Sequence, residues 1–114
     1  MEDCIFCKIV NKEIPSEIIY EDDKVMAFKD VNPQSPVHVL VIPKEHIESS
    51  NDIDDNNSQL IGHIFVTIKE LAKELGIDED GYRIVNNCGS FGGQTVYHIH
   101  FHLLGGRKFS WPPG

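Results

Sequence analysis

The chain has 114 residues, of which 40% are hydrophobic and 25% charged, and its formal net charge is −8. This length and composition fit one globular domain over residues 1–114, and no apolar run reaches the ~20 residues that a membrane span needs. The excess of acidic residues argues against a nucleic-acid-binding surface, so we expect neither nucleic acid nor a membrane as a partner.

The N-terminal residues indicate where the protein works. The sequence Met1-Glu2-Asp3 carries two acidic side chains and lacks the apolar stretch of a secretory signal, so a cytoplasmic location is expected.

Three cysteines cannot all pair within one chain. In a cytosolic protein the Cys4-x-x-Cys7 spacing suggests metal or redox chemistry before a structural disulfide.

Hydrophobic patterning predicts the elements of the first half of the chain. Residues 4–11 are expected to form a short helix. Residues 18–20 and 25–30 predict two short strands, joined by an acidic turn. Residues 38–42 (HVLVI) are continuous and β-branched, which predicts a strand buried on both faces that ends at Pro43.

A long helix is predicted next, because apolar residues recur at three- and four-residue steps from Leu60 to Leu75. Gly76 follows directly and suits the end of a helix. The start of the helix can be capped by one of three polar residues, Asp54, Asp55 or Asn57.

Two more strands are predicted at residues 82–86 and 96–104, on either side of a glycine-rich turn at 89–93. The chain therefore reads as an α+β fold: a largely antiparallel sheet of about five strands with one long helix and one short helix.

The predicted last strand carries the strongest functional pattern. Because side chains alternate between the two faces of a strand, three histidines share one face: His98, His100 and His102. The apolar residues between them share the other face and can pack on the long helix: Ile99, Phe101 and Leu103. A row of imidazoles contributes little to packing, which points to a function.

Two kinds of chemistry suit this row. Neighbouring imidazoles on a strand can bind one metal ion, but a metal hydrolase also needs a nearby carboxylate, and residues 84–107 contain no Asp or Glu. The alternative is nucleophilic catalysis on phosphorus, because a neutral imidazole is a good nucleophile near pH 7. The glycine-rich turn supplies backbone N–H groups suited to phosphate oxygens.

These residues resemble the histidine triad (HIT) superfamily, and within it the Hint branch of nucleoside phosphoramidases. The resemblance spans essentially the whole chain. It rests on the three alternating histidines, on Gly92-Gly93-Gln94 ahead of them and on the final Trp111-Pro112-Pro113-Gly114. It implies a HIT-like fold that dimerises into one continuous sheet, and the hydrolysis of purine nucleoside 5′-phosphoramidates or related acyl-adenylates to the nucleoside monophosphate.

The resemblance also implies roles for single residues. His100 matches the histidine that attacks the α-phosphorus and carries the nucleotidyl group covalently. His102 matches a phosphate-binding histidine, and His38 a histidine that supports the triad from a neighbouring strand. Thr95 stands where the family usually has a serine near the leaving group, and it keeps the hydroxyl.

By the same resemblance, Asn87, Gly93 and Val96 match positions that contact the nucleotide. Asp30 matches the acid that binds the ribose hydroxyls, as suits a carboxylate accepting two hydrogen bonds. The apolar slot around the base matches Phe6, Ile9, Ile14, Phe28 and Val31. These apolar residues would look the same in an ordinary core.

The cysteine pair resembles bacterial HIT proteins and galactose-1-phosphate uridylyltransferases. The matching set is Cys4, Cys7, His46 and His98, which would bind a structural zinc ion with no open coordination position. Such a site would anchor the N-terminal segment to the catalytic strand and leave His100 free. No organic cofactor is expected.

Three other functions compete with the phosphoramidase. A dinucleoside polyphosphate hydrolase is disfavoured by the Trp-Pro-Pro-Gly ending, which resembles the Hint branch. A non-catalytic AMP-binding interaction protein would require a silent triad. A zinc hydrolase would lose its activity on chelation without unfolding.

Overall fold

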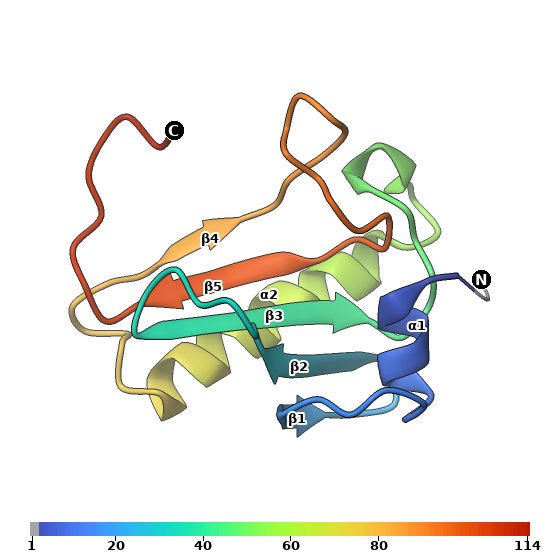
Figure 1. Cartoon of the computed structure of the whole chain (residues 1–114), viewed down its shortest axis with the longest axis horizontal. Coiled ribbons are helices and arrows are strands. Elements are labelled where there is room, and N and C mark those ends of the chain that lie inside the picture. Colours follow the sequence, from blue (N-terminus) through green and yellow to red (C-terminus); the bar gives the residue numbers. More distant parts are fainter. Residues whose placement is uncertain (1–2) are drawn as a thin grey trace.

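The computed structural model describes residues 3–114 and contains a five-stranded sheet in the order β1-β2-β3-β5-β4 (Figure 1). Its strands are β1 (Ile18–Glu21), β2 (Val25–Lys29), β3 (Val37–Pro43), β4 (Arg83–Val85) and β5 (Phe101–Gly105). Each neighbouring pair is antiparallel. The sheet places the central strand β3 between β2 and β5, so that His38 on β3 and His102 on β5 can meet.

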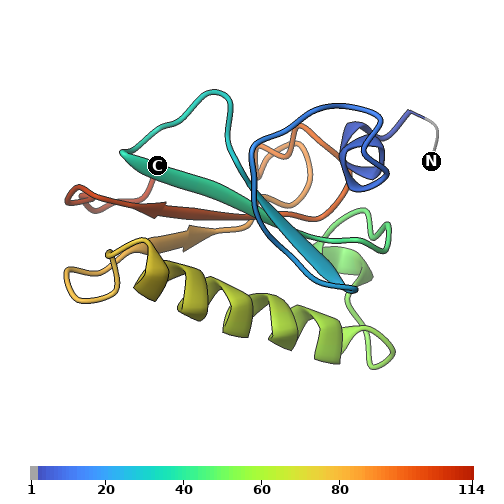
Figure 2. The ribbon, with the colours of Figure 1, turned by 90° about the horizontal axis from the view of Figure 1, so that it is seen from below.

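Two α-helices pack on opposite faces of this sheet. The long helix α2 (Ser58–Glu74) runs along one face, and the short helix α1 (Ile5–Val10) lies on the other face, near one end (Figure 2). A 3₁₀ turn, Ser50–Asp52, precedes α2. Among the residues described, no helix is long and apolar enough to cross a membrane.

Strand alternation divides the core into two layers. On the α2 side, Ala27, Val39, Val41 and Leu103 pack against helix residues such as Ile68. The α1 side is smaller, with buried residues from three elements: Phe6, Ile9, Met26, Phe28, Leu40 and Ile42. The chemistry-bearing histidines belong to this second face, so the larger core on the α2 side supports them without containing them.

The α+β fold class and the predicted helices are confirmed, and four of the five strands lie where they were predicted, within one residue at most ends. The predicted apolar face of the last strand is also correct, because Ile99, Phe101 and Leu103 all enter the α2-side core. At the start of α2 the cap is Asn57, but its side chain makes no cap hydrogen bond. The Asn57 carboxamide instead bonds to the backbone of Asp52 and Asp54.

The start of the last strand was predicted wrongly. A strand over 96–104 was expected, but β5 begins only at Phe101. Its partner β3 ends at Pro43, which has no N–H to continue the ladder. The amide of Ile99 donates instead to the carbonyl of Ile47, at 2.6 Å, beyond the end of β3. His98 and His100 therefore precede the strand, although the alternation of side chains between the two faces persists through them.

A half-buried hydrogen bond joins α2 to the β1–β2 turn, and the sequence patterns did not predict it. His63 Nε2 lies 2.7 Å from Asp22 Oδ2, which also accepts a hydrogen bond from the Tyr20 hydroxyl at 2.8 Å. The other oxygen of Asp22 accepts from the amides of Lys24 and Val25. Burial alone would raise the pKa of Asp22, but these hydrogen bonds outweigh it and hold the pKa well below its usual range.

This pairing predicts a pH-dependent contribution to stability. Replacing Asp22→Asn should lower the free energy of unfolding at pH 7 by about 1–3 kcal/mol, because charged hydrogen bonds are lost. Because the pKa of Asp22 is lower in the folded than in the unfolded state, its carboxylate stabilises the fold at pH values above the unfolded-state pKa of about 3.9. This contribution to the free energy of unfolding is lost as the pH falls below that pKa. The stability gap between wild type and variant, measured by urea unfolding, should therefore narrow between about pH 5 and pH 2. The exposed neighbour Asp23→Asn is the control, and a gap that stays constant with pH would contradict the assignment.

Candidate active site and metal centre

Hydrogen bonds fix the protonation of the His38–His102 pair. The amide of Gln34 donates to His38 Nδ1 at 3.0 Å, so the single proton of the neutral ring lies on His38 Nε2. This Nε2 is 2.8 Å from His102 Nδ1 and donates to it. His102 must then carry its own proton on Nε2. The chain from Gln34 through His38 thus leaves His102 with an N–H donor suited to a phosphoryl oxygen.

A separate contact orients His100. Its Nδ1 donates to the carbonyl oxygen of His98 at 2.8 Å, which leaves the lone pair of His100 on Nε2. The side-chain amide of Asn86 donates to the His100 carbonyl at 2.9 Å and holds the backbone. The ring of Phe6 meets His100 edge-on, with centroids 5.1 Å apart. His100 is therefore a neutral imidazole with one nitrogen available to act as a nucleophile.

Burial keeps these imidazoles uncharged. It lowers the pKa of His38 and of His100, although the carboxylate of Asp30 opposes the shift in both. Burial, together with the neighbouring His100 and His38, lowers the pKa of His102 to about 4. At pH 7 all three rings are neutral, as nucleophilic attack by one and hydrogen bonding by the others require.

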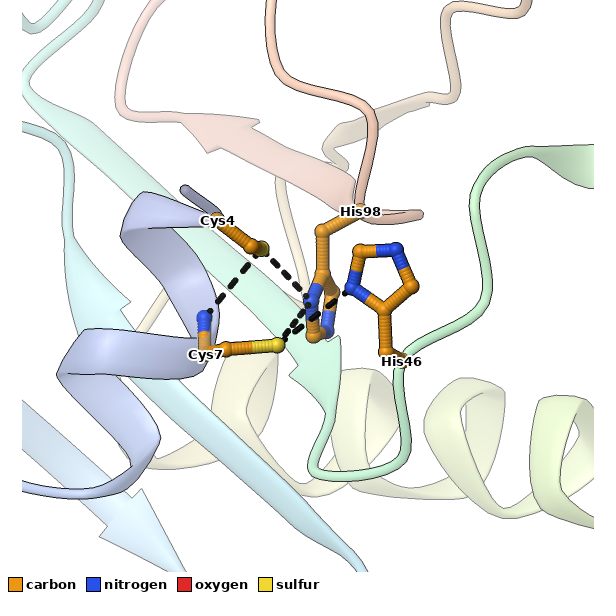
Figure 3. Close-up of side chains that lie close together, drawn as sticks. All are labelled: Cys4, Cys7, His46 and His98. Atoms are coloured by element: carbon orange, nitrogen blue, oxygen red, sulfur yellow. Dashed lines mark hydrogen bonds between the residues drawn. The ribbon is translucent and has the colours of Figure 1, made fainter. Parts of the chain in front are cut away.

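The four predicted metal ligands converge between α1 and the segment before β5 (Figure 3). His98 Nδ1 lies 3.3 Å from Cys4 Sγ and 3.6 Å from Cys7 Sγ, and His46 Nδ1 lies 3.3 Å from Cys7 Sγ. His98 is fully buried, and its Nε2 donates to the carbonyl of Pro43 at 2.8 Å. That bond places the lone pair of His98 on Nδ1, toward the two sulfurs.

This donor set fits a tetrahedral zinc ion. Zn–S bonds of ≈ 2.3 Å and Zn–N bonds of ≈ 2.0–2.1 Å place sulfur and nitrogen ligands roughly 3.5 Å apart, as the observed spacings do. Burial and the neighbouring Cys4 raise the pKa of Cys7 to about 11, so a thiolate here needs a nearby cation. With four protein ligands, the ion would have a structural and not a catalytic role.

A second cluster of possible ligands does not fit a metal ion. Asp30, His38 and His102 place ligand atoms within 4.8 Å of one another. However, the His38 Nε2 that would have to coordinate carries the proton donated to His102, because Gln34 occupies Nδ1. His38 cannot donate a lone pair there; with Gln34 and His102 it forms a hydrogen-bond relay, beside which Asp30 lies.

Of the predicted nucleotide-binding residues, Asp30 lies beside this relay, and Asn87 and Gly93 lie in the glycine-rich segment before β5. Asp30 follows β2, with its side chain 18% exposed and its Oδ2 3.4 Å from His38 Nε2. Its other oxygen accepts from the amide of Asn32. The Asn87 side chain donates to the Gly92 carbonyl at 2.7 Å and closes the glycine-rich turn. Gly93 in that turn has φ +82°, a conformation that favours glycine.

Most residues of the predicted base slot gather on the α1 side of the sheet. Phe6, Ile9 and Phe28 are buried together, and Ile14 and Val96 pack against them. Val31 does not join them, because its side chain is 99% exposed in the loop after β2. Thr95 and Val96 lie outside any strand and line a cavity of about 380 Å³ with Ile5 and Tyr97.

Sequence reasoning missed two residues that organise the site. Gln34 sets the tautomer of His38 through its backbone amide, and a backbone contact leaves no signal in residue type. Gln94 is buried, and its side chain bonds to the Glu48 and Val96 carbonyls and accepts from the Gly89 amide. The place of Gln94 in the motif Gly92-Gly93-Gln94, directly after the glycine-rich turn, could have suggested this role.

Comparison with known proteins matches residues 11–109 to the HIT domain family. A HIT-like protein of Synechococcus elongatus is 54% identical over 99% of this chain and 98% of its own. The 14 kDa zinc-binding protein of Zea mays is 50% identical over 96% of this chain and 87% of its own.

Solved structures agree. A HIT family hydrolase from Legionella pneumophila is 52% identical and superposes with a TM-score of 0.97, covering 98% of this chain and all of its own. A histidine triad protein from Clostridium difficile is 54% identical, with a TM-score of 0.93 and 96% coverage of both chains. The chain belongs to the HIT family.

Proposed function

We propose that the protein hydrolyses purine nucleoside 5′-phosphoramidates through a covalent nucleotidyl intermediate on His100. The observation that carries this proposal is the bond from His100 Nδ1 to the His98 carbonyl, which leaves Nε2 as a neutral, oriented nucleophile. The structural relatives named HIT family hydrolases support hydrolysis as the class of reaction.

The reaction has two steps. His100 Nε2 attacks the α-phosphorus, the bond from phosphorus to the leaving nitrogen breaks, and the amine departs after taking up a proton from Thr95, which recovers one from solvent. Water then attacks phosphorus, gives up a proton to solvent and displaces His100 by breaking the P–Nε2 bond, which releases the nucleoside monophosphate and the neutral imidazole. The Nε2–H of His102 donates to a phosphoryl oxygen throughout. Asp30 accepts from the ribose hydroxyls.

Three further assignments complete the proposal. The apolar slot for the purine is formed by Phe6, Ile9, Ile14, Phe28 and Val96. Val31, which is exposed in the loop after β2, would pack on the bound nucleotide. Asn87 and Gly93 hold the glycine-rich turn against the phosphate. The site Cys4–Cys7–His46–His98 holds structural zinc.

We also propose that two copies pair across the β4 edge into one continuous sheet. β4 is an edge strand, and two large apolar side chains near it are exposed: Phe65 at 45% and Trp111 at 80%. Phe65 packs edge-on against Phe101 of β5, and the tail before Trp111 is held to β4 by Arg83, which donates to the Ser110 carbonyl. A second copy would cover both side chains.

The first experiment tests the nucleophile. His100→Ala should reduce hydrolysis of a fluorogenic adenosine phosphoramidate by roughly 10³-fold or more, the scale of losing a nucleophile, and should retain AMP binding. His63→Ala, on the other face of the sheet, is the matched control and should keep near wild-type turnover. Full turnover by His100→Ala would exclude covalent catalysis at this residue. If the wild type binds AMP without turnover, the protein is a nucleotide-binding module.

Metal analysis tests the zinc site. Purified protein should hold one zinc per chain, and Cys7→Ser should lose it, because three ligands bind zinc more weakly than four. Cys88→Ser removes a cysteine outside the cluster and should keep the full zinc content. Equal zinc content in both variants would show that the metal lies elsewhere.

Sedimentation tests the dimer. Phe65→Glu should shift the protein from dimer to monomer, because a charge would be buried unpaired in the interface. Val66→Glu is the matched control, because it places the same charge on the next residue of α2. Val66 is 55% exposed and lines a pocket with Tyr20 and Glu70, whereas Phe65 packs against β5. A dimer that tolerates Phe65→Glu but not Val66→Glu would move the interface to the opposite edge of the sheet.

A further inference from the structure

The short helix α1 belongs to both the metal site and the nucleotide slot. It supplies Cys4 and Cys7 to the ligand cluster, and Phe6 lies between them in sequence. The Phe6 ring meets three other rings edge-on, with centroid separations of 5.1 Å to His100, 5.5 Å to Phe28 and 5.9 Å to His98. One turn of helix therefore carries two metal ligands and a wall of the site around the nucleophile.

The attachment of α1 to the rest of the molecule rests on side chains, and the ligand cluster supplies two of them. The helix has six residues, and an isolated helix below ~12–15 residues is marginal in water. Within the described chain, the backbone hydrogen bonds of residues 4–13 close inside that segment. Side chains hold the helix to the sheet: buried Phe6 and Ile9, Val10 packed against the same core, the exposed pair Lys12–Glu21, and the two cysteines.

The other metal ligands are anchored independently. His98 Nε2 is bonded to the Pro43 carbonyl, and the next amide, that of Ile99, is bonded to the Ile47 carbonyl. His98 therefore keeps its place, and with it the orientation of His100, when the cluster is open. Loss of the metal would release α1 before it disturbs the triad.

We propose that metal occupancy at Cys4–Cys7–His46–His98 sets the nucleotide affinity of this protein by holding Phe6 of α1 in the purine slot. The inference rests on the proposed function for the location of the nucleotide, but not on the hydrolytic step. Phe6 is a positioning residue in this scheme, because it acts on the base and on the His100 ring, not on the reacting atoms. The metal site and the nucleotide site are then coupled, and the coupling must be reciprocal.

Calorimetry with AMP measures the coupling in one direction. Zinc-depleted wild type should bind AMP about tenfold more weakly than zinc-loaded wild type, within the usual range of coupling between two sites. Amide hydrogen exchange should show faster exchange in residues 4–13 of the depleted protein and unchanged exchange in β3 and β5. Equal AMP affinity in the two forms overturns the proposal.

Chelator competition measures the reverse direction and starts from the loaded, folded protein. Saturating AMP should raise the zinc affinity by the same factor, about tenfold. The competition experiment tests the coupling even if the zinc-depleted protein fails to fold. An unchanged zinc affinity in the presence of bound AMP overturns the proposal.

Two variants locate the coupling. Phe6→Leu keeps an apolar side chain on α1 but loses the aromatic edge against His100, so it should bind zinc normally and reduce the coupling to less than about threefold. Cys88→Ser, a cysteine outside the cluster, should keep the full coupling. Full coupling in Phe6→Leu would show that α1 acts through another residue and would overturn the assignment to Phe6.

The outcomes separate this proposal from the proposed function. Coupled binding of AMP and zinc without any phosphoramidate turnover would reject hydrolysis and support the coupling. Turnover by zinc-loaded protein with uncoupled binding would support hydrolysis and reject the coupling. Failure of both forms to bind AMP would reject the nucleotide site and the coupling together.

Discussion

The arrangement of the site depends on one buried histidine, His98. Its Nε2 is fixed by the Pro43 carbonyl, its Nδ1 faces the two cysteines, and its own carbonyl orients His100. A fully buried imidazole is costly unless its polar atoms are satisfied, and here both nitrogens have partners. The bond to Pro43 holds His98 whether or not the cysteines engage Nδ1, and the bond from the His98 carbonyl holds the candidate nucleophile His100.

The same logic of backbone anchors extends through the triad. His38 is set by the amide of Gln34, and His102 is set by His38. Each ring therefore has one possible tautomer, decided by main-chain atoms on the loop before β3 and at the end of that strand. Neutral rings with fixed tautomers leave a lone pair on His100 and a hydrogen-bond donor on His102, and the Asp30 carboxylate lies beside them, with its Oδ2 3.4 Å from His38 Nε2.

Residue patterns were sufficient to predict the elements, and the family resemblance named four side chains that the structure brings together: Cys4, Cys7, His46 and His98. The alternation from His98 to Leu103 correctly separated the functional face from the core, because burial of apolar side chains imposes a two-residue period even where the hydrogen-bond ladder has stopped. The start of β5 could not be predicted, since it is decided by the Ile99–Ile47 hydrogen bond and by Pro43, which lies 56 positions before Ile99 in sequence. The preferences of neighbouring residues for strand or loop cannot predict a hydrogen bond between residues so far apart in sequence.

The tautomers of the histidines could not be predicted from the sequence either. The partners that set them, the amide of Gln34 and the carbonyls of Pro43 and His98, are backbone atoms. Every residue type supplies the carbonyl, and every type except proline supplies the amide. The pattern Cys4-x-x-Cys7 predicted ligands, but only the structure shows that Phe6 between them reaches His100. The spacing that brings the sulfurs of Cys4 and Cys7 together in one helical turn also presents the intervening ring to His100. A helix too short to be stable alone can then report the state of one site to the other.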